Sequence, residues 1–204
     1  MSSPKAPEPL QQRMKDRMRS EVAEIAIGLF LDKGFDETTA DEICEVAGIS
    51  RRTFFRYFKG KEDVVVARLS KLAEDGCHRF VTVPASEDRW TALRMSMTPF
   101  EDWAQANPSR AVALFRLIEN APSLRASYLD RVDRWRASLA AVVSTKFDLD
   151  SRTDLEVAVI AAASVGAYIA ATRAWAESGG SDSLPALFDR AFNALRPDAP
   201  ALWG

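Results

Sequence analysis

Histidine and cysteine are scarce in this sequence of 204 residues, which contains one histidine and two cysteines. A protein metal site needs several ligands at set spacings, and the adjacent Cys77 and His78 point in different directions on a helix with no second ligand pair. A nucleophile elbow, a phosphate-binding loop and a histidine–carboxylate arrangement are also missing. We therefore expect no metal, no cofactor and no enzymatic activity.

Long apolar runs are equally lacking. The most apolar stretch, residues 157–171, is short and rich in alanine, serine and glycine, which favours a buried helix over a membrane span. The N-terminus has no apolar core of a secretory signal. We expect a cytoplasmic protein with no membrane partner. In that compartment Cys44 and Cys77 are expected as buried thiols, with redox sensing as the alternative.

The charge of the chain is balanced overall, at a net −2, but it is concentrated locally. Five acidic residues and no basic ones lie between Asp36 and Glu45, whereas five basic residues and no acidic ones lie between Ser50 and Lys61. The second segment thus has the charge that a DNA-binding helix needs. The acidic segment comes before it in the chain and includes most of the preceding helix.

The local signals around these charges predict a helix-turn-helix. Thr39 and Glu42 form a capping box, Gly48 ends a short helix, and Ser50 caps the next one. Phe54 and Phe58 give the second helix a buried stripe, so that its other face presents arginines. Such a helix can lie in the major groove of DNA, although the same geometry also occurs in proteins that bind other proteins.

The remaining pattern is helical throughout, and we expect an all-α fold of about nine helices. A first helix ends at Gly34, and further helices are expected at about 61–80, 87–106, 109–120, 123–146, 152–178 and 183–195. Residues 1–12 are expected to be a disordered tail, 13–62 the helix-turn-helix DNA-binding domain, and 63–204 a ligand-binding and dimerisation domain. The basic residues from Arg13 to Arg19 could be a DNA-contacting arm or a solvated first turn.

Residues 29–39 and 47–62, which read LFLDKGFDETT and AGISRRTFFRYFKGKE, resemble the N-terminal domain of TetR-type bacterial transcriptional regulators. The resemblance covers about residues 17–70. It implies a helical homodimer, more often a repressor than an activator, which a small molecule releases from a palindromic operator in double-stranded DNA. The DNA-binding residues that it implies, together with the caps, are Thr39, Ser50, Arg51, Arg52, Thr53, Phe55, Arg56, Tyr57 and Lys61. Phe55 departs from the tyrosine frequent in the family, so one phosphate hydrogen bond is lost.

The C-terminal part is rich in methionine and aromatic residues, which predicts an apolar pocket for an apolar or amphipathic effector. Its candidate lining is Met97, Phe100, Trp103, Phe115, Trp135 and Tyr168, and its candidate polar anchors are Arg94, Arg116, Glu119 and Arg173. Small and apolar residues on the last two helices predict a dimer interface at Ala158, Ala162, Val165, Gly166, Ile169, Leu187, Ala191 and Phe192. The same faces could instead pack within one subunit.

Overall fold

A computed structural model describes residues 10–84, 87–147 and 155–196. Within these ranges every regular element is an α-helix, so the expected all-α fold is confirmed. The chain divides into two compact units, with the boundary between Arg68 and Leu69. This boundary falls a few residues after the one expected from the sequence, and it lies inside one continuous helix.

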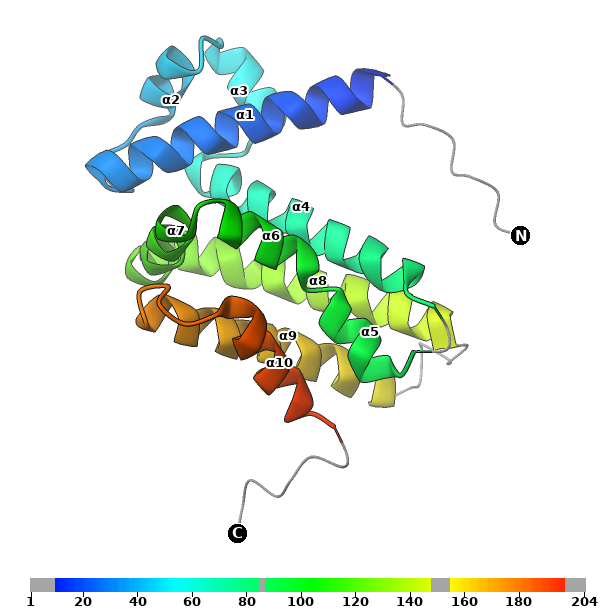
Figure 1. Cartoon of the computed structure of the whole chain (residues 1–204). Helices are drawn as coiled ribbons and strands as arrows, with labels where there is room; N and C mark the ends of the chain where they lie inside the picture. The colour runs from blue at the N-terminus through cyan, green and yellow to red at the C-terminus, as the bar shows by residue number, and fades with distance from the viewer. Residues whose placement is uncertain (1–9, 85–86, 148–154, 197–204) are drawn as a thin grey trace. The chain divides into compact units, whose positions relative to one another are not determined.

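The first unit contains α1 (Leu10–Lys33), α2 (Ala40–Val46), α3 (Arg51–Tyr57) and the beginning of α4 (Lys61–Thr82) (Figure 1). Gly34 follows α1 with φ of 99°, a conformation that favours glycine, and the ring of Phe35 returns to lie 5.0 Å from that of Phe30. The predicted tail lies mostly outside the described residues, but α1 begins at Leu10. Residues 13–19 therefore belong to a helix and not to an extended arm.

The second unit contains the rest of α4, followed by α5 (Arg89–Met95), α6 (Thr98–Ala106), α7 (Pro108–Asn120), α8 (Pro122–Phe147), α9 (Leu155–Glu177) and α10 (Leu184–Asn193). The single helix predicted at 87–106 is wrong, because the chain turns at Ser96 and Met97. Pro99, which a helix tolerates in its first turn and not in its interior, lies in the first turn of α6. Pro122 likewise begins α8.

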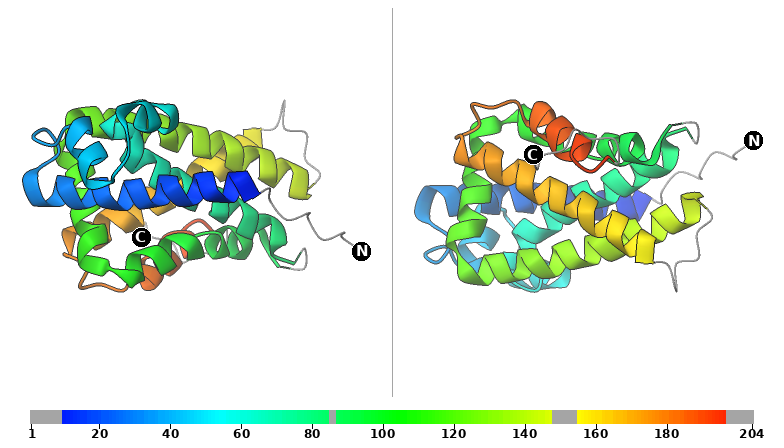
Figure 2. Two further views of the ribbon diagram at one scale, coloured as in Figure 1. Left: turned by 90° about the horizontal axis from the view of Figure 1, so that it is seen from above. Right: turned by 90° about the horizontal axis from the view of Figure 1, so that it is seen from below.

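Helix α9 forms the centre of the second unit. It packs against α7, α8 and α10, and Figure 2 shows it lying beside α8 and α10. By length and composition α9 could cross a membrane, with a mean hydropathy of 1.7 over its most apolar window. Half of that window is buried inside the unit, which accounts for much of its apolar composition.

Helix α4 is held closely by its neighbours within the second unit. A Cβ atom added at Gly76 would lie 2.7 Å from the carbonyl oxygen of Ser96, so glycine allows this approach of two backbones. At the end of α4, the amine of Lys146 from α8 donates hydrogen bonds to the carbonyls of Phe80 (2.8 Å) and Val83 (2.6 Å). These contacts fix the C-terminal half of α4 against α8.

Candidate functional site

The helix-turn-helix formed by α2 and α3 has the caps and the turn predicted from the sequence. The hydroxyl of Thr39 accepts a hydrogen bond from the amide of Glu42 at 3.2 Å, and the carboxylate of Glu42 accepts one from the amide of Thr39 at 2.9 Å. Gly48 has φ of 65°, and the hydroxyl of Ser50 accepts a hydrogen bond from the amide of Thr53 at 3.1 Å. Each short helix therefore begins with a side-chain cap that satisfies one of its free amides.

Burial of one face of α3 determines which face remains available. Phe54 and Phe58 are buried, with ring centroids 5.4 Å apart, and they pack into the core of the first unit. The opposite face carries exposed Arg51, Arg52 and Arg56. This face is strongly basic, and it can approach phosphates and the edges of bases.

The three arginines of α3 have different surroundings. Arg51 pairs with Asp41 of α2 at 3.0 Å, and Arg56 donates a hydrogen bond of 2.8 Å to the hydroxyl of Tyr57 and lies over its ring. Arg52 is exposed and makes no hydrogen bond or ion pair with any residue that the structure describes. Arg52 is therefore the arginine that can bind a new partner without first losing one.

Phe55 adds an apolar contact surface to this basic face. Its side chain is 49% exposed, although its ring lies edge-on against that of Phe54 at 5.2 Å. The guanidinium of Arg51 lies 5.9 Å from the centre of the Phe55 ring. An exposed aromatic ring between arginines is suited to contact with a thymine methyl group, and it offers no hydrogen bond to a phosphate.

Lys61, which the family resemblance implies as a DNA contact, is held within the first unit in this structure. Its amine donates hydrogen bonds to the carbonyls of Phe35 (2.7 Å), Asp36 (3.2 Å) and Thr38 (3.2 Å), and lies 4.5 Å from the centre of the Phe35 ring. The three donor hydrogens of the ammonium group are thus used within the first unit. Lys61 connects the beginning of α4 to the loop between α1 and α2.

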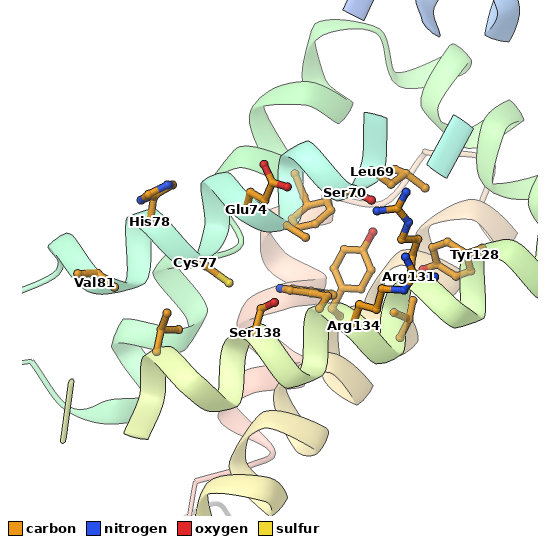
Figure 3. Close-up of a pocket in the computed structure, with 16 residues that line it drawn as sticks. Leu69, Ser70, Glu74, Cys77, His78, Val81, Tyr128, Arg131, Arg134 and Ser138 are labelled. Atoms are coloured by element: carbon orange, nitrogen blue, oxygen red, sulfur yellow. The ribbon is translucent and has the colours of Figure 1, made fainter. Parts of the chain in front are cut away.

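The second unit contains a cavity of about 580 Å³, which is large enough for a small molecule. Figure 3 shows the side chains that surround it, most of which come from α4 and α8. The lining consists of Leu69, Ser70, Ala73, Glu74, Cys77, His78, Val81, Phe100, Tyr128, Arg131, Val132, Arg134, Trp135, Ser138, Val142 and Tyr168. The cavity therefore combines apolar walls with several charged and hydroxyl side chains.

Three of the predicted pocket residues meet in this cavity. The rings of Phe100, Trp135 and Tyr168 are in mutual contact, with centroids 4.5 to 5.5 Å apart. Met97 is instead fully buried in the core, and it lines neither this cavity nor the smaller one described below. Apolar composition alone does not separate core from cavity, which is why the sequence grouped Met97 with the lining.

The other two predicted lining residues, Trp103 and Phe115, lie elsewhere. Their rings are in edge contact at 6.1 Å, and Phe115 lines a smaller cavity of about 70 Å³ between α7, α8 and α9. Tyr128 borders both cavities. The main wall formed by α4 was missed, because residues such as Glu74 and His78 have the composition of an ordinary solvated helix face.

The four predicted polar anchors do not line the main cavity either. Arg94 pairs with Glu101 at 2.7 Å and with Asp189 at 2.6 Å, which connects α5 to α6 and α10. The remaining three lie near the end of α9: Arg116 donates to the carbonyl of Ala176, and Arg173 pairs with Glu119 at 3.1 Å. Within the cavity, Arg131 and Arg134 of α8 hold the positions that could bind a polar group.

Burial keeps the titratable groups deep in the cavity uncharged. It raises the pKa of Tyr128 to about 12, and it raises the pKa of Tyr168 well above its usual value. Burial also raises the pKa of the Cys77 thiol, which disfavours the reactive thiolate. Among the described residues, histidine, cysteine and carboxylate side chains form no cluster that could hold a metal ion.

The predicted dimer residues fall into two groups. Ala158, Ala162 and Gly166 are exposed along one side of α9, and nothing lies within 4 Å of a Cβ atom added at Gly166. Ile169 of α9 and Leu187 and Ala191 of α10 are half-buried. Val165 and Phe192 are buried inside the unit, at 4% and 2% exposure, so their side chains belong to its core and not to a free face.

Comparisons with known proteins agree with this geometry. Residues 24–67 match the family of bacterial regulatory proteins named after tetR, and residues 87–200 match the MftR C-terminal domain. The chain is 30% identical to the HTH-type transcriptional regulator TcmR of Streptomyces glaucescens, over 99% of this chain and 92% of that protein. It is 25% identical to the HTH-type transcriptional repressor KstR2 of Rhodococcus jostii, over 70% and 72% of the two chains.

A solved structure supports the same fold. The transcriptional regulator FadR of Bacillus subtilis, determined in complex with stearoyl-CoA, superimposes with a TM-score of 0.59. The match covers 84% of this chain and 94% of that one at 14% identity.

Proposed function

Because the chain belongs to the TetR family of bacterial transcriptional regulators, we propose that it is a sequence-specific DNA-binding repressor that responds to a small apolar or amphipathic ligand. The observation that carries this proposal is the exposed basic face of α3. Its arginines project from a capped helix whose other face is fixed by Phe54 and Phe58. Proteins of this family are usually repressors, and one relative is named as such.

A homodimer would place two copies of α3 over a palindromic operator, about 34–36 Å apart, in successive major grooves. The exposed alanine and glycine residues on α9 support this arrangement, because small side chains allow two helices to approach closely. A stable dimer would also cover the apolar part of α9 that the subunit leaves exposed. The protein is then a cytoplasmic dimer with two binding partners, DNA and an effector.

The cavity supports ligand control of this dimer. Helix α4 contributes seven of the lining residues in the second unit, and through Lys61 it also connects to the α1–α2 loop of the first unit. A ligand that binds one position of α4 more tightly than another shifts the equilibrium between the two. The size of that shift equals the ratio of the two affinities, so a repressor needs a ligand that discriminates strongly.

The test begins with the unliganded protein and a pool of random duplex DNA, followed by sequencing of the bound fraction. We expect an inverted repeat to be enriched. The Arg52→Ala variant should bind the selected site roughly 5- to 150-fold more weakly, corresponding to about 1–3 kcal/mol for an arginine that contacts a guanine. Arg136→Ala, which removes an exposed arginine of α8, is the matched control.

Enrichment of no sequence, or full affinity in the Arg52→Ala variant, would overturn the assignment of α3 as the reading helix. Recovery of single half-sites would argue against the paired arrangement. If the chain binds another protein and binds no DNA, the result would instead favour a helical protein-interaction module.

A further inference from the structure

The cavity in the second unit has a polar end and an apolar end. Helices α4 and α8 run in the same direction along it: Figure 3 shows Leu69 and Ser70 beside Arg131 at one end, and Lys146 contacts Phe80 and Val83 beyond the other. Ser70 therefore lies at the end near Tyr128 and Arg131, and Val81 lies at the end near Val142. Figure 3 shows Ser70 and Arg131 together, with Val81 at the opposite end.

The two arginines are confined to one half of this axis. Arg131 and Arg134 belong to the first turns of α8 that reach the cavity, whereas the far end is lined by Val81, Val142 and the exposed His78. Arg134 forms an ion pair with Asp130 one turn earlier. Arg131 is half-buried, so a charge held there is less screened by water than one on an open surface.

The length of the cavity suits an extended molecule. Ser70 and Val81 are eleven residues apart on one helix, which corresponds to about 16 Å at 1.5 Å per residue. Between them, the walls are formed by Ala73 and by the aromatic cluster of Phe100, Trp135 and Tyr168. An apolar body can lie along these walls while a charged end group stays near Arg131.

We propose that the cavity binds an amphipathic carboxylate, with its carboxylate at the Ser70–Arg131 end and its apolar body directed towards Val81 and Val142. This inference rests on the proposed function, because it takes the cavity as the effector site. A carboxylate accepts charge-assisted hydrogen bonds from a guanidinium and a hydroxyl. The exposed carboxylate of Glu74 lies on the α4 wall and repels an anion. Removal of the Glu74 charge should therefore change carboxylate affinity in the opposite direction to removal of the Arg131 charge.

The experiment measures the dissociation constants of decanoate and 1-decanol by calorimetry on the full chain, below the concentrations at which either aggregates. Decanoate should bind the wild type more tightly than decanol. Arg131→Gln should weaken decanoate by about ten-fold or more and leave decanol within about two-fold, because the alcohol lacks the charge. Glu74→Gln should strengthen decanoate, and Val142→Trp should weaken both ligands alike by filling the apolar end.

Arg136→Gln is the matched control, since Arg136 is an exposed arginine of α8 outside the cavity. Equal losses of decanoate and decanol in Arg131→Gln, equal weakening of decanoate by Arg136→Gln, or no saturable binding of decanoate by the wild type would overturn the proposal. If Arg131→Gln fails to fold, an unchanged decanoate affinity in Glu74→Gln overturns it.

DNA binding measured on the same samples separates this inference from the proposed function. Operator binding by a wild-type protein that shows no saturable decanoate binding would overturn only the carboxylate site. Decanoate binding by a protein that selects no DNA sequence would overturn only the regulatory function.

Discussion

The guanidinium of Arg51 lies 3.0 Å from the carboxylate of Asp41, so a residue on α2 holds the first arginine of α3. Both side chains are largely exposed, at 67% for Arg51 and 59% for Asp41. Such a pair contributes little to stability, about 0–1 kcal/mol. It nevertheless competes with DNA for Arg51, because the guanidinium must leave the carboxylate to reach a base or a phosphate.

Asp41→Asn should therefore increase affinity for the selected operator, by at most about five-fold from release of the ion pair. The measurement is fluorescence anisotropy at fixed salt concentration. Glu45→Gln is the control, because it removes an exposed acidic charge from the same helix without breaking the Arg51 pair. Equal gains in the two variants would attribute the effect to net charge instead of release of Arg51.

Lys61→Met should destabilise the first unit by roughly 1–3 kcal/mol, because it leaves three carbonyls without their charged donor. Thermal unfolding measures this change. Lys59→Met, at the neighbouring exposed lysine, should change stability by less than about 0.5 kcal/mol. If Lys61 contacted a phosphate instead, its loss would lower the slope of log affinity against log salt by about 1, with little change in unfolding.

The difference between these two roles of Lys61 illustrates what the sequence could predict. The caps at Thr39 and Ser50 and the turn at Gly48 depend on residues a few positions apart, so the sequence was sufficient to locate them. The partners of Lys61 lie 23 to 26 residues away, and nothing in the local pattern distinguishes a lysine that caps a loop from one that faces solvent.

The cavity shows the same limit on a larger scale. Aromatic content indicated Phe100, Trp135 and Tyr168, which line the cavity and whose rings contact each other. It also indicated Met97, whose side chain is buried in the core of the second unit. The wall residues Glu74 and Arg131 depend on how α4 and α8 are aligned, and that alignment is a tertiary property that one sequence does not reveal.

Alkaline pH should destabilise the second unit through Tyr128. Its pKa is about 12 in the folded protein and about 10 in an unfolded chain, because burial penalises the phenolate. Below pH 10 both states keep the proton, so the stabilisation is fully present. Between pH 10 and 12 the unfolded chain loses the proton while the folded chain retains it, and stability falls as pH rises.

Denaturant unfolding at several pH values measures this dependence for the wild type and for Tyr128→Phe. The variant should show a shallower decline between pH 10 and 12, since one of the groups that binds a proton more tightly in the folded state is gone. Buried Tyr168 should still contribute to the decline, because its pKa is also raised. An unchanged slope in Tyr128→Phe would contradict the prediction.

A dimer formed through α9 should be sensitive to charge at its smallest residue. Gly166 is exposed, with open space around the position of an added Cβ atom, so a glutamate there fits within the subunit. In a close pairing of two copies of α9, the same carboxylate would be buried without a partner, at a cost of several kcal/mol. Sedimentation of Gly166→Glu should therefore report a folded monomer, and its affinity for the full operator should fall towards that for a half-site. Ala126→Glu, at an exposed position of α8, should remain dimeric, and a dimeric Gly166→Glu would place the interface elsewhere.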